Sequence, residues 1–149
     1  MAIGEICNRE VIIVDRETTV HEAARLMRQH HVGDVVIVEV LNGVRKPVGI
    51  VTDRDLVVEV MAPDLAPMVI TVGDIMVPEL AMVQDSTGIY EAIQYMRGKS
   101  VRRMPVVDSQ GGLVGILTLD DLLELLSEEL LDLSSLVKRE QKKESLSRR

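Results

Sequence analysis

Short runs of apolar residues alternate along this chain with segments in which apolar residues recur at every third or fourth position. The runs predict buried β-strands, and the spacing of three or four residues predicts amphipathic helices. In the first half of the chain the pattern predicts a strand at 11–14, a helix after Thr19, strands at 35–40 and 48–51, and a helix from Asp53. The predicted order of elements is therefore β-α-β-β-α.

Two local motifs support this order. Thr19-x-x-Glu22 matches a capping box, in which the hydroxyl and the carboxylate satisfy backbone N–H groups at the start of a helix. Asn42-Gly43 separates the second and third predicted strands, and an Asn-Gly pair is a strong signal for a two-residue hairpin turn. The first half of the chain thus contains a β-hairpin with a helix on either side of it.

The same pattern occurs a second time. A shift of 69 positions places 20–23 on 89–92, and after a length change of three residues in the hairpin a shift of 66 places 48–52 on 114–118. Such a duplication predicts two copies of one small unit. Because each copy buries too little surface to be stable alone, we expect the two copies to share one core. The predicted segments are repeat one at 1–61, a linker with two prolines at 62–70, repeat two at 71–127, and a C-terminal helical extension with a basic tail at 128–149.

The composition indicates an aliphatic interior. Hydrophobic residues make up 46% of the 149 residues, but Phe and Trp are absent and the aromatic residues are Tyr90 and Tyr95. Binding of single-stranded nucleic acid depends on aromatic stacking and positive charge, whereas this chain has a formal net charge of −7. Nucleic acid is therefore not expected as a partner.

The charge is unevenly distributed. Residues 138–149 carry six basic and two acidic side chains, a net charge of +4, so residues 1–137 carry −11. We expect the tail to be solvated and frayed, with contact to an acidic partner as the alternative. The single cysteine, Cys7, excludes an intramolecular disulfide, and no apolar run reaches the ~18 residues of a membrane span. These features predict a cytoplasmic protein that does not bind membranes.

The strongest motif occurs once in each repeat. Gly-Ile-Val-Thr-Asp-Arg-Asp-Leu at 49–56 and Gly-Ile-Leu-Thr-Leu-Asp-Asp-Leu at 115–122 share glycine, two apolar residues, threonine, two variable positions and aspartate. They resemble the signature of CBS (cystathionine-β-synthase) domains, and Arg-Arg-Met-Pro-Val-Val-Asp at 102–108 resembles the central strand of that family. The resemblance covers residues 3–126. It implies an α+β fold (mixed α/β) of tandem β-α-β-β-α CBS repeats, packed through their sheets about a pseudo-twofold axis as in a Bateman module, with a regulatory role and no enzymatic activity.

The Thr-x-x-Asp spacing within the motif has two interpretations. Threonine can cap the helix that follows the strand, while aspartate returns a bond to the backbone N–H of the cap. Alternatively, the ionised aspartate accepts hydrogen bonds from both hydroxyls of a ribose, beside the threonine hydroxyl. The two roles can coexist, because a carboxylate has two oxygens.

In CBS domains the ligand site is composite, with the Thr and Asp of one repeat facing the first strand and the Pro-containing strand of the other. The aliphatic members would enclose an adenine, Asp55 would hold the ribose, and Arg102, with a second arginine, would face phosphates. Because Arg102 and Arg103 alternate along a strand, one of them could instead be solvated or paired with an acid. The resemblance assigns to this site, called site A, Ile50, Thr52, Arg54, Asp55, Met76, Leu80, Ala81, Arg102, Arg103 and Pro105.

The second composite site, site B, departs from the family pattern. Gly33-Asp34 replace the paired arginines, and Val36 replaces the proline. Asp34 and Asp120 would repel phosphate, so site B is expected to be empty or to hold an uncharged or cationic adenosine compound such as S-adenosylmethionine. No cofactor is required, and the regulatory ligand implied for the preferred site A is AMP, ADP, ATP or S-adenosylmethionine. Site B is assigned Cys7, Val11, Ile12, Gly33, Ile116, Thr118 and Asp121.

No other residues suggest catalysis or metal binding. His21, His30 and His31 lack the tight spacing of a metal site, and no motif places a general base for Cys7. We therefore expect neither a metal site nor an enzyme.

The last predicted helix is rich in leucine. Beyond about residue 127 the second repeat should be complete, so the remaining leucines predict contact with another chain. The resemblance implies a homodimer through the CBS-pair faces, to which this helix would add, and an unidentified regulated protein is a further expected partner. A ligand-independent dimerisation or scaffold module is the alternative function. Alternating steps of three and four relate Leu123, Leu126, Leu130, Leu133 and Val137.

Overall fold

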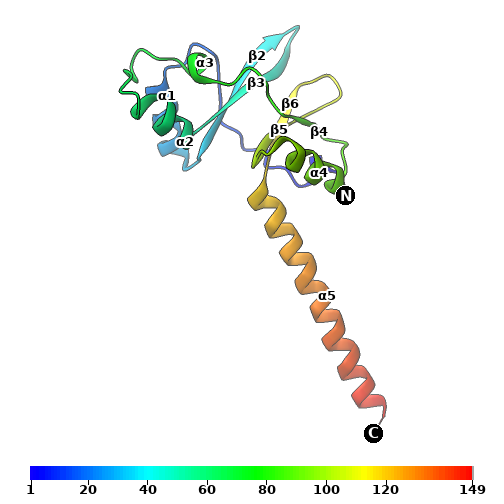
Figure 1. Ribbon diagram of the computed structural model, residues 1–149. Coiled ribbons are helices and arrows are strands. Elements are labelled where there is room, and N and C mark those ends of the chain that lie inside the picture. The colour runs from blue at the N-terminus through cyan, green and yellow to red at the C-terminus, as the bar shows by residue number, and fades with distance from the viewer. Residues whose placement is uncertain (149) are drawn as a thin grey trace. The chain divides into compact units, whose positions relative to one another are not determined.

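The structure is a computed structural model and describes residues 1–148. The chain divides into two compact units, which meet between Leu117 and Thr118. The first unit holds all the strands of the two sheets, and the second consists of helix α5 (Leu119–Ser147) with its cap (Figure 1).

The first sheet has the order β1-β2-β3. Strand β1 (Ile13–Val14) runs parallel to β2 (Asp34–Leu41), and β2 pairs antiparallel with β3 (Val44–Thr52). Asn42 and Gly43 connect β2 to β3 with φ angles of 53° and 77°, the left-handed geometry that a tight hairpin turn requires. The predicted hairpin is confirmed. The strand predicted at 11–14 begins only at Ile13, because pairing with β2 is limited to two residues.

Two helical segments accompany this sheet. Helix α1 (Val20–His30) begins at Thr19, whose hydroxyl accepts a 3.1 Å hydrogen bond from the backbone N–H of Glu22. After β3, a short α2 (Asp53–Asp55) passes into the π-helical segment η2 (Leu56–Met61). The helix predicted from Asp53 is thus present. In η2 the backbone hydrogen bonds join residues five positions apart, as in a π-helix. One example is the 2.8 Å bond from the N–H of Ala62 to the carbonyl of Val57.

The second half repeats this order. Helix α3 (Val72–Ile75) leads to β4 (Val83–Gln84), α4 (Ile89–Lys99), β5 (Arg103–Val107) and β6 (Leu113–Thr118), and the sheet order is β4-β5-β6. The duplication is therefore confirmed at the level of structure. Strand β4 begins at Val83, so Leu80 and Ala81 lie outside it.

The two repeats interlock by exchanging their first turns. The segment η1 (Ile3–Glu5) belongs to repeat one in sequence but bonds to repeat two, whereas α3 bonds back to repeat one. Each bond donated by η1 has a matching bond donated by α3, and the donors of the two bonds differ by 69 positions, as do their acceptors. A pseudo-twofold axis between the repeats produces this relation. The bonds run from Ile3 N to Thr87 O (2.8 Å), Gly4 N to Asp85 O (2.9 Å), Val72 N to Thr18 O (2.8 Å) and Gly73 N to Arg16 O (3.1 Å).

The sheets also share part of the core. Val36 and Val38 on β2 pack in one buried cluster with Ile116 on β6, and β3 contacts β5. A second cluster, which includes Ala23 and Val35, lies between α1 and the first sheet. The predicted α+β fold, with repeats packed through their sheets, is confirmed.

The second unit is a single continuous helix. Thr118 and Asp121 cap its start, and Leu122 is buried with 3% exposure. All residues of 126–148 are exposed, and the helix passes without a break through the boundary predicted at residue 127. The tail is solvated as expected, but within the described residues it is helical through Ser147 and not frayed, and Arg148 pairs with Glu144 at 2.5 Å. No helix within residues 1–148 combines the length and the apolar character needed to cross a membrane.

Candidate ligand-binding site

Each Thr-x-x-Asp motif forms a reciprocal cap. In repeat one, Thr52 Oγ1 accepts a 3.1 Å bond from the N–H of Asp55, and Asp55 Oδ2 accepts a 2.9 Å bond from the N–H of Thr52. Thr118 and Asp121 make the same two bonds, at 3.1 and 3.3 Å. The capping interpretation is confirmed for both copies. The bonds also hold the half-buried Asp55 carboxylate in a defined orientation, with Oδ2 engaged by the cap.

The aliphatic members of site A come from both repeats. Ile50 on β3 is half-buried and lies opposite Val36. Met76, which follows α3, lies against the neighbouring residue on β3: a Cβ placed on Gly49 would be 2.8 Å from Met76 Sδ. The fold therefore places Met76 next to the strand that carries Ile50, as the sequence-based assignment requires.

Leu80 and Ala81 line a hollow of about 430 Å³ on repeat two. Both residues are half-buried and lie outside the strands. The other lining residues are Glu79, Tyr95, Lys99 and Val101, so this hollow has an aliphatic wall beside one acidic and one basic side chain.

Arg103 bridges the two repeats through an ion pair. Its Nη1 donates a 2.6 Å hydrogen bond to Oδ2 of Asp34, and the two side chains are 30% and 16% exposed. Gly33 lies beside both Arg103 and Asp53, since a Cβ there would be 3.8 Å from Arg103 Nη1 and 3.3 Å from Asp53 Oδ2. The alternative in which one arginine pairs with an acid is confirmed for Arg103. The charge of Asp34 is correspondingly balanced, which removes much of its expected repulsion of phosphate.

The remaining polar and apolar members of site A differ in exposure. Arg54 and Arg102 are exposed, and Arg102 immediately precedes β5. Pro105, within β5, is among the fully buried side chains. The two arginines therefore lie at the surface, whereas Pro105 packs in the interior.

Site B is more closed on the side that belongs to the first unit. The N–H of Asn8 donates to the carbonyl of Ile116 at 2.9 Å, and the N–H of Ile116 donates to the carbonyl of Asn8 at 2.8 Å. Cys7 lies beside them, 2.9 Å from the position of a Cβ on Gly115. The segment Cys7-Asn8 thus extends the second sheet beyond β6. Sequence reasoning missed Asn8, because no local pattern marks a residue that pairs with a distant strand.

The other residues assigned to site B lie around the first sheet or in the second unit. Val11, Ile12 and Gly33 are half-buried, and Ile116 is 5% exposed. Thr118 and Asp121 belong to the second unit. The assembly of site B from these residues stays a prediction.

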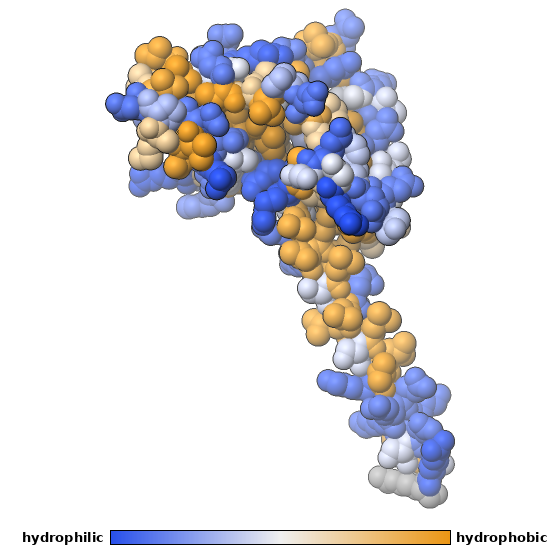
Figure 2. Space-filling view, viewed as in Figure 1, coloured by the Kyte–Doolittle hydropathy of each residue, from blue (hydrophilic) through white to orange (hydrophobic). Residues whose placement is uncertain are grey.

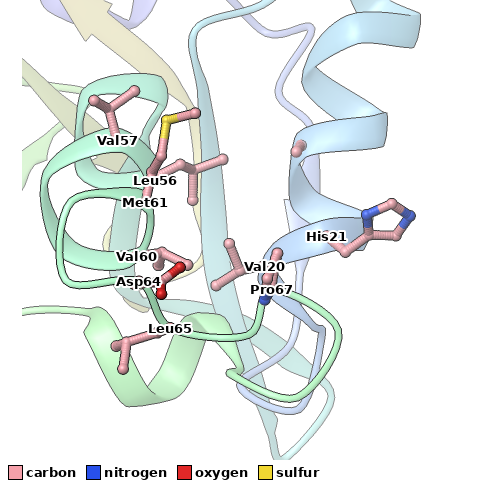
Figure 3. Close-up of a pocket in the computed structure, with 10 residues that line it drawn as sticks. Val20, His21, Leu56, Val57, Val60, Met61, Asp64, Leu65 and Pro67 are labelled. Atoms are coloured by element: carbon pink, nitrogen blue, oxygen red, sulfur yellow. The ribbon is translucent and has the colours of Figure 1, made fainter.

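A second hollow, of about 410 Å³, was not predicted from the sequence. Figure 3 shows it between η2, the linker and the first turn of α1, with Leu56, Val60 and Met61 on one side and Val20 and Pro67 on the other. Most of the lining is apolar. Two of the lining side chains, Val57 and Met61, are 54% and 74% exposed. This surface suits contact with another apolar surface. Within residues 1–148 no group of three or more His, Cys, Asp or Glu is arranged to hold a metal ion.

Two interlocked β-α-β-β-α repeats, each with a capped Thr-x-x-Asp motif after its third strand, define a paired-repeat module of the Bateman type. The CBS domain model matches residues 3–62 and 72–128. The chain belongs to the CBS domain family.

The chain is similar over more than four fifths of its own length to the proteins that follow, but it spans only 62% of the length of the first of them. Uncharacterized protein MK0525 of Methanopyrus kandleri is 38% identical over 125 residues, which cover 84% of this chain and 62% of that protein. Hypoxic response protein 1 of Mycobacterium tuberculosis is 33% identical over 124 residues, covering 83% and 84%. The structure of Hypoxic Response Protein I, which holds two coordinated zinc ions, superposes with a TM-score of 0.72 at 31% identity and covers 83% of this chain and 98% of its own.

One further solved structure contains adenosine compounds. The CBS domain pair of protein MJ0100 was solved in complex with 5′-methylthioadenosine and S-adenosyl-L-methionine. It superposes with a TM-score of 0.72 at 23% identity, covering 85% of this chain and 99% of its own, and so shares the fold.

Proposed function

We propose that this CBS pair is a regulatory module that binds an adenosine-containing ligand at site A. The ligand would be AMP, ADP, ATP or S-adenosylmethionine. The observation that carries the proposal is the Thr52–Asp55 cap, which holds a half-buried carboxylate in a defined orientation. A carboxylate fixed in this way can accept the hydroxyls of a ribose at little cost in conformational entropy.

The other residues assigned to site A would contact the adenine and the phosphates of the ligand. Ile50, Met76, Leu80 and Ala81 would supply aliphatic surface to the adenine, which suits a chain without Phe or Trp. Arg102 and Arg54, both exposed, would face phosphates. Arg103 would reach a phosphate only by exchanging its bond to Asp34, so its part in binding depends on that competition.

Two observations support the preference for site A. In site B, the backbone of Ile116 is engaged on both its N–H and its carbonyl by Asn8, and Cys7 packs directly against Gly115. At the corresponding place in site A, a flexible methionine side chain lies against Gly49. A methionine can change rotamer to admit a ligand more readily than a hydrogen-bonded backbone can.

The module would act by shifting a conformational equilibrium, not by catalysis. A ligand that contacts both repeats favours whichever relative packing gives it more contacts, and it shifts the equilibrium only by that difference in affinity. The output would be a change in the activity of a bound partner or in the geometry of the module's own oligomer.

Titration calorimetry with AMP, ADP, ATP and S-adenosylmethionine tests the proposal directly. We expect at least one of the four to bind, and the absence of binding by all of them at millimolar concentration would refute it. The site is tested by Asp55→Ala, with Asp121→Ala as the matched control, because both changes remove the same capping bond. Asp55→Ala should weaken binding at least tenfold more than Asp121→Ala, and equal effects would contradict the choice of site A.

We also propose that the chain forms a homodimer through the faces of the CBS pair. The exposed apolar residues around η2 and the linker support this, since a patch of this kind is typical of protein interfaces. They are Val57 (54%), Met61 (74%), Met68 (65%) and Val69 (72%). If no adenosine compound binds, this observation favours the second candidate function, a ligand-independent dimerisation or scaffold module.

A further inference from the structure

Helix α5 carries charge of opposite sign at its two ends. Residues 120–132 contain six acidic side chains and no basic one, a net charge of −6. Residues 138–148 contain five basic side chains against two acidic ones, a net charge of +3. A helix dipole favours acids at the N-terminus and bases at the C-terminus, but that effect fades within the first and last turns. Capping therefore accounts for Asp120 and Asp121 and for few of the other charges.

The same helix carries an uncovered apolar stripe. Figure 2 shows hydrophobic residues along α5 until the charged segment begins. The residues of the stripe are spaced by alternating steps of three and four, so at 100° per residue they fall on one face of the helix. This spacing is typical of a helix that packs on another helix. The stripe consists of Leu123 (54% exposed), Leu126 (47%), Leu130 (68%), Leu133 (60%) and Val137 (53%).

A single helix of this kind lacks the packing that stabilises most helices in proteins. Every side chain of 126–148 is exposed, so no residue of the described chain covers the stripe. Most helical stability in proteins comes from burial of an apolar face, not from helix propensity. The leucine stripe is therefore an apolar surface suited to packing against another helix.

We propose that α5 pairs in antiparallel orientation with α5 of a second copy of this chain. With the two apolar stripes superposed about Leu130, Lys138 and Arg139 of one chain lie alongside Asp121 and Glu124 of the other. The same contact occurs twice, because the pair has a twofold axis. Unlike charges attract across such an interface and also steer the encounter.

Parallel pairing of the same stripes is disfavoured by charge. It would place the six acidic side chains of 120–132 beside their own copies, and the basic segment beside its own copy. Like charges brought together across an interface cost free energy. The antiparallel orientation leaves Glu128, Glu129 and Asp132 near like charges around the centre of the pair, and Glu140 near Asp120 at each end.

The proposal specifies one contact of the homodimer proposed above and is independent of ligand binding. Its failure can be distinguished from failure of the homodimer. A chain that is a monomer overturns both proposals. A chain that stays dimeric after disruption of the stripe overturns the α5 contact alone and retains the dimer through the repeat faces.

Two adjacent leucines provide a matched pair of variants. Leu130 and Leu131 are 68% and 69% exposed in the single chain, but Leu131 lies about 100° around the helix and outside the stripe. Leu130→Gln should raise the dimer Kd on the order of a hundredfold, since each dimer loses two buried leucines. Leu131→Gln should change it by less than about threefold. Sedimentation equilibrium measures both constants, and equal effects would overturn the proposed face.

The relative orientation of the two α5 helices is tested by pulsed electron–electron double resonance, which measures the distance between spin labels. Lys142→Cys and Ser127→Cys are each made in a full-length Cys7→Ser background, whose dimer Kd is first compared with that of the unchanged chain. In the antiparallel pair, labels at 142 are separated along the axis by about 36 Å and labels at 127 by about 9 Å, from a rise of about 1.5 Å per residue. Parallel pairing gives short separations at both positions, and that result would overturn the proposal.

Discussion

The signature glycine of each repeat provides a sharp test of the packing, because the two glycines face different neighbours. Gly49 and Gly115 occupy equivalent positions, and neither has a positive φ angle, so alanine is compatible with both backbones. At Gly115 a Cβ would lie 2.5 Å from the carbonyl oxygen of Asn8. At Gly49 it would lie 2.8 Å from Sδ of Met76, an atom of a flexible side chain.

The expected change in the free energy of unfolding depends on whether the group that the new Cβ would meet can move. Replacement of glycine by alanine stabilises a protein by about 0.4–1 kcal/mol through the unfolded chain. Relief of the clash at Gly115 requires displacement of Asn8 and loss of its two bonds to Ile116, each contributing about 0.5–1.5 kcal/mol, in addition to packing strain of about 1–3 kcal/mol. We expect Gly115→Ala to lower the free energy of unfolding by about 2–4 kcal/mol. Gly49→Ala should change it by less than about 1 kcal/mol, because Met76 can adopt another rotamer.

Urea unfolding followed by circular dichroism measures both values under one set of conditions. A loss for Gly49→Ala as large as that for Gly115→Ala would refute the reasoning. The same pair of variants reports on site A. Since Met76 is proposed to contact the adenine, Gly49→Ala should weaken ligand binding even though the fold retains most of its stability.

Three further predictions concern individual contacts. Thr52→Ala should lower the free energy of unfolding by about 1 kcal/mol through loss of its cap, and Thr52→Ser should restore it; a denaturation midpoint unchanged by the alanine would argue against the cap. Asp34→Asn should cost about 1 kcal/mol of stability and, because it releases Arg103, raise the calorimetric affinity for ATP several-fold at low salt; an unaltered affinity would indicate that Arg103 does not reach the phosphates. Truncation after Ser127 should weaken self-association in sedimentation experiments but retain nucleotide binding; self-association unchanged by the truncation would contradict a contact through α5.

Much of the architecture could be predicted from local patterns. The hairpin at Asn42-Gly43 requires left-handed backbone geometry that this dipeptide readily adopts. The caps at Thr19 and Thr52 depend on residues only three positions away. Duplication of these short-range signals predicted two β-α-β-β-α units. The ends of the short strands could not be predicted, because β1 and β4 extend only as far as their pairing with a distant strand.

The candidate site shows the same division. The resemblance assigned Asp55 and Met76 to site A by their positions in the repeats, but the sequence could not establish the surroundings of either residue. Arg103 was assigned to site A with pairing to an acid as the alternative, and its partner proved to be Asp34, 69 positions away in the chain. Asn8 was not assigned a role, although it completes the edge of the second sheet.

By itself, then, the sequence determined the repeated elements, their caps and turns, and the stripe of leucines on the last helix, all of which arise from interactions over a few residues. The tertiary structure alone decided which repeat each first turn joins, that Asp34 of the other repeat holds Arg103, and that Gly115 faces backbone whereas Gly49 faces a side chain. These features depend on contacts between distant segments, and such contacts form only when the two repeats pack together to bury an apolar surface that neither can bury alone.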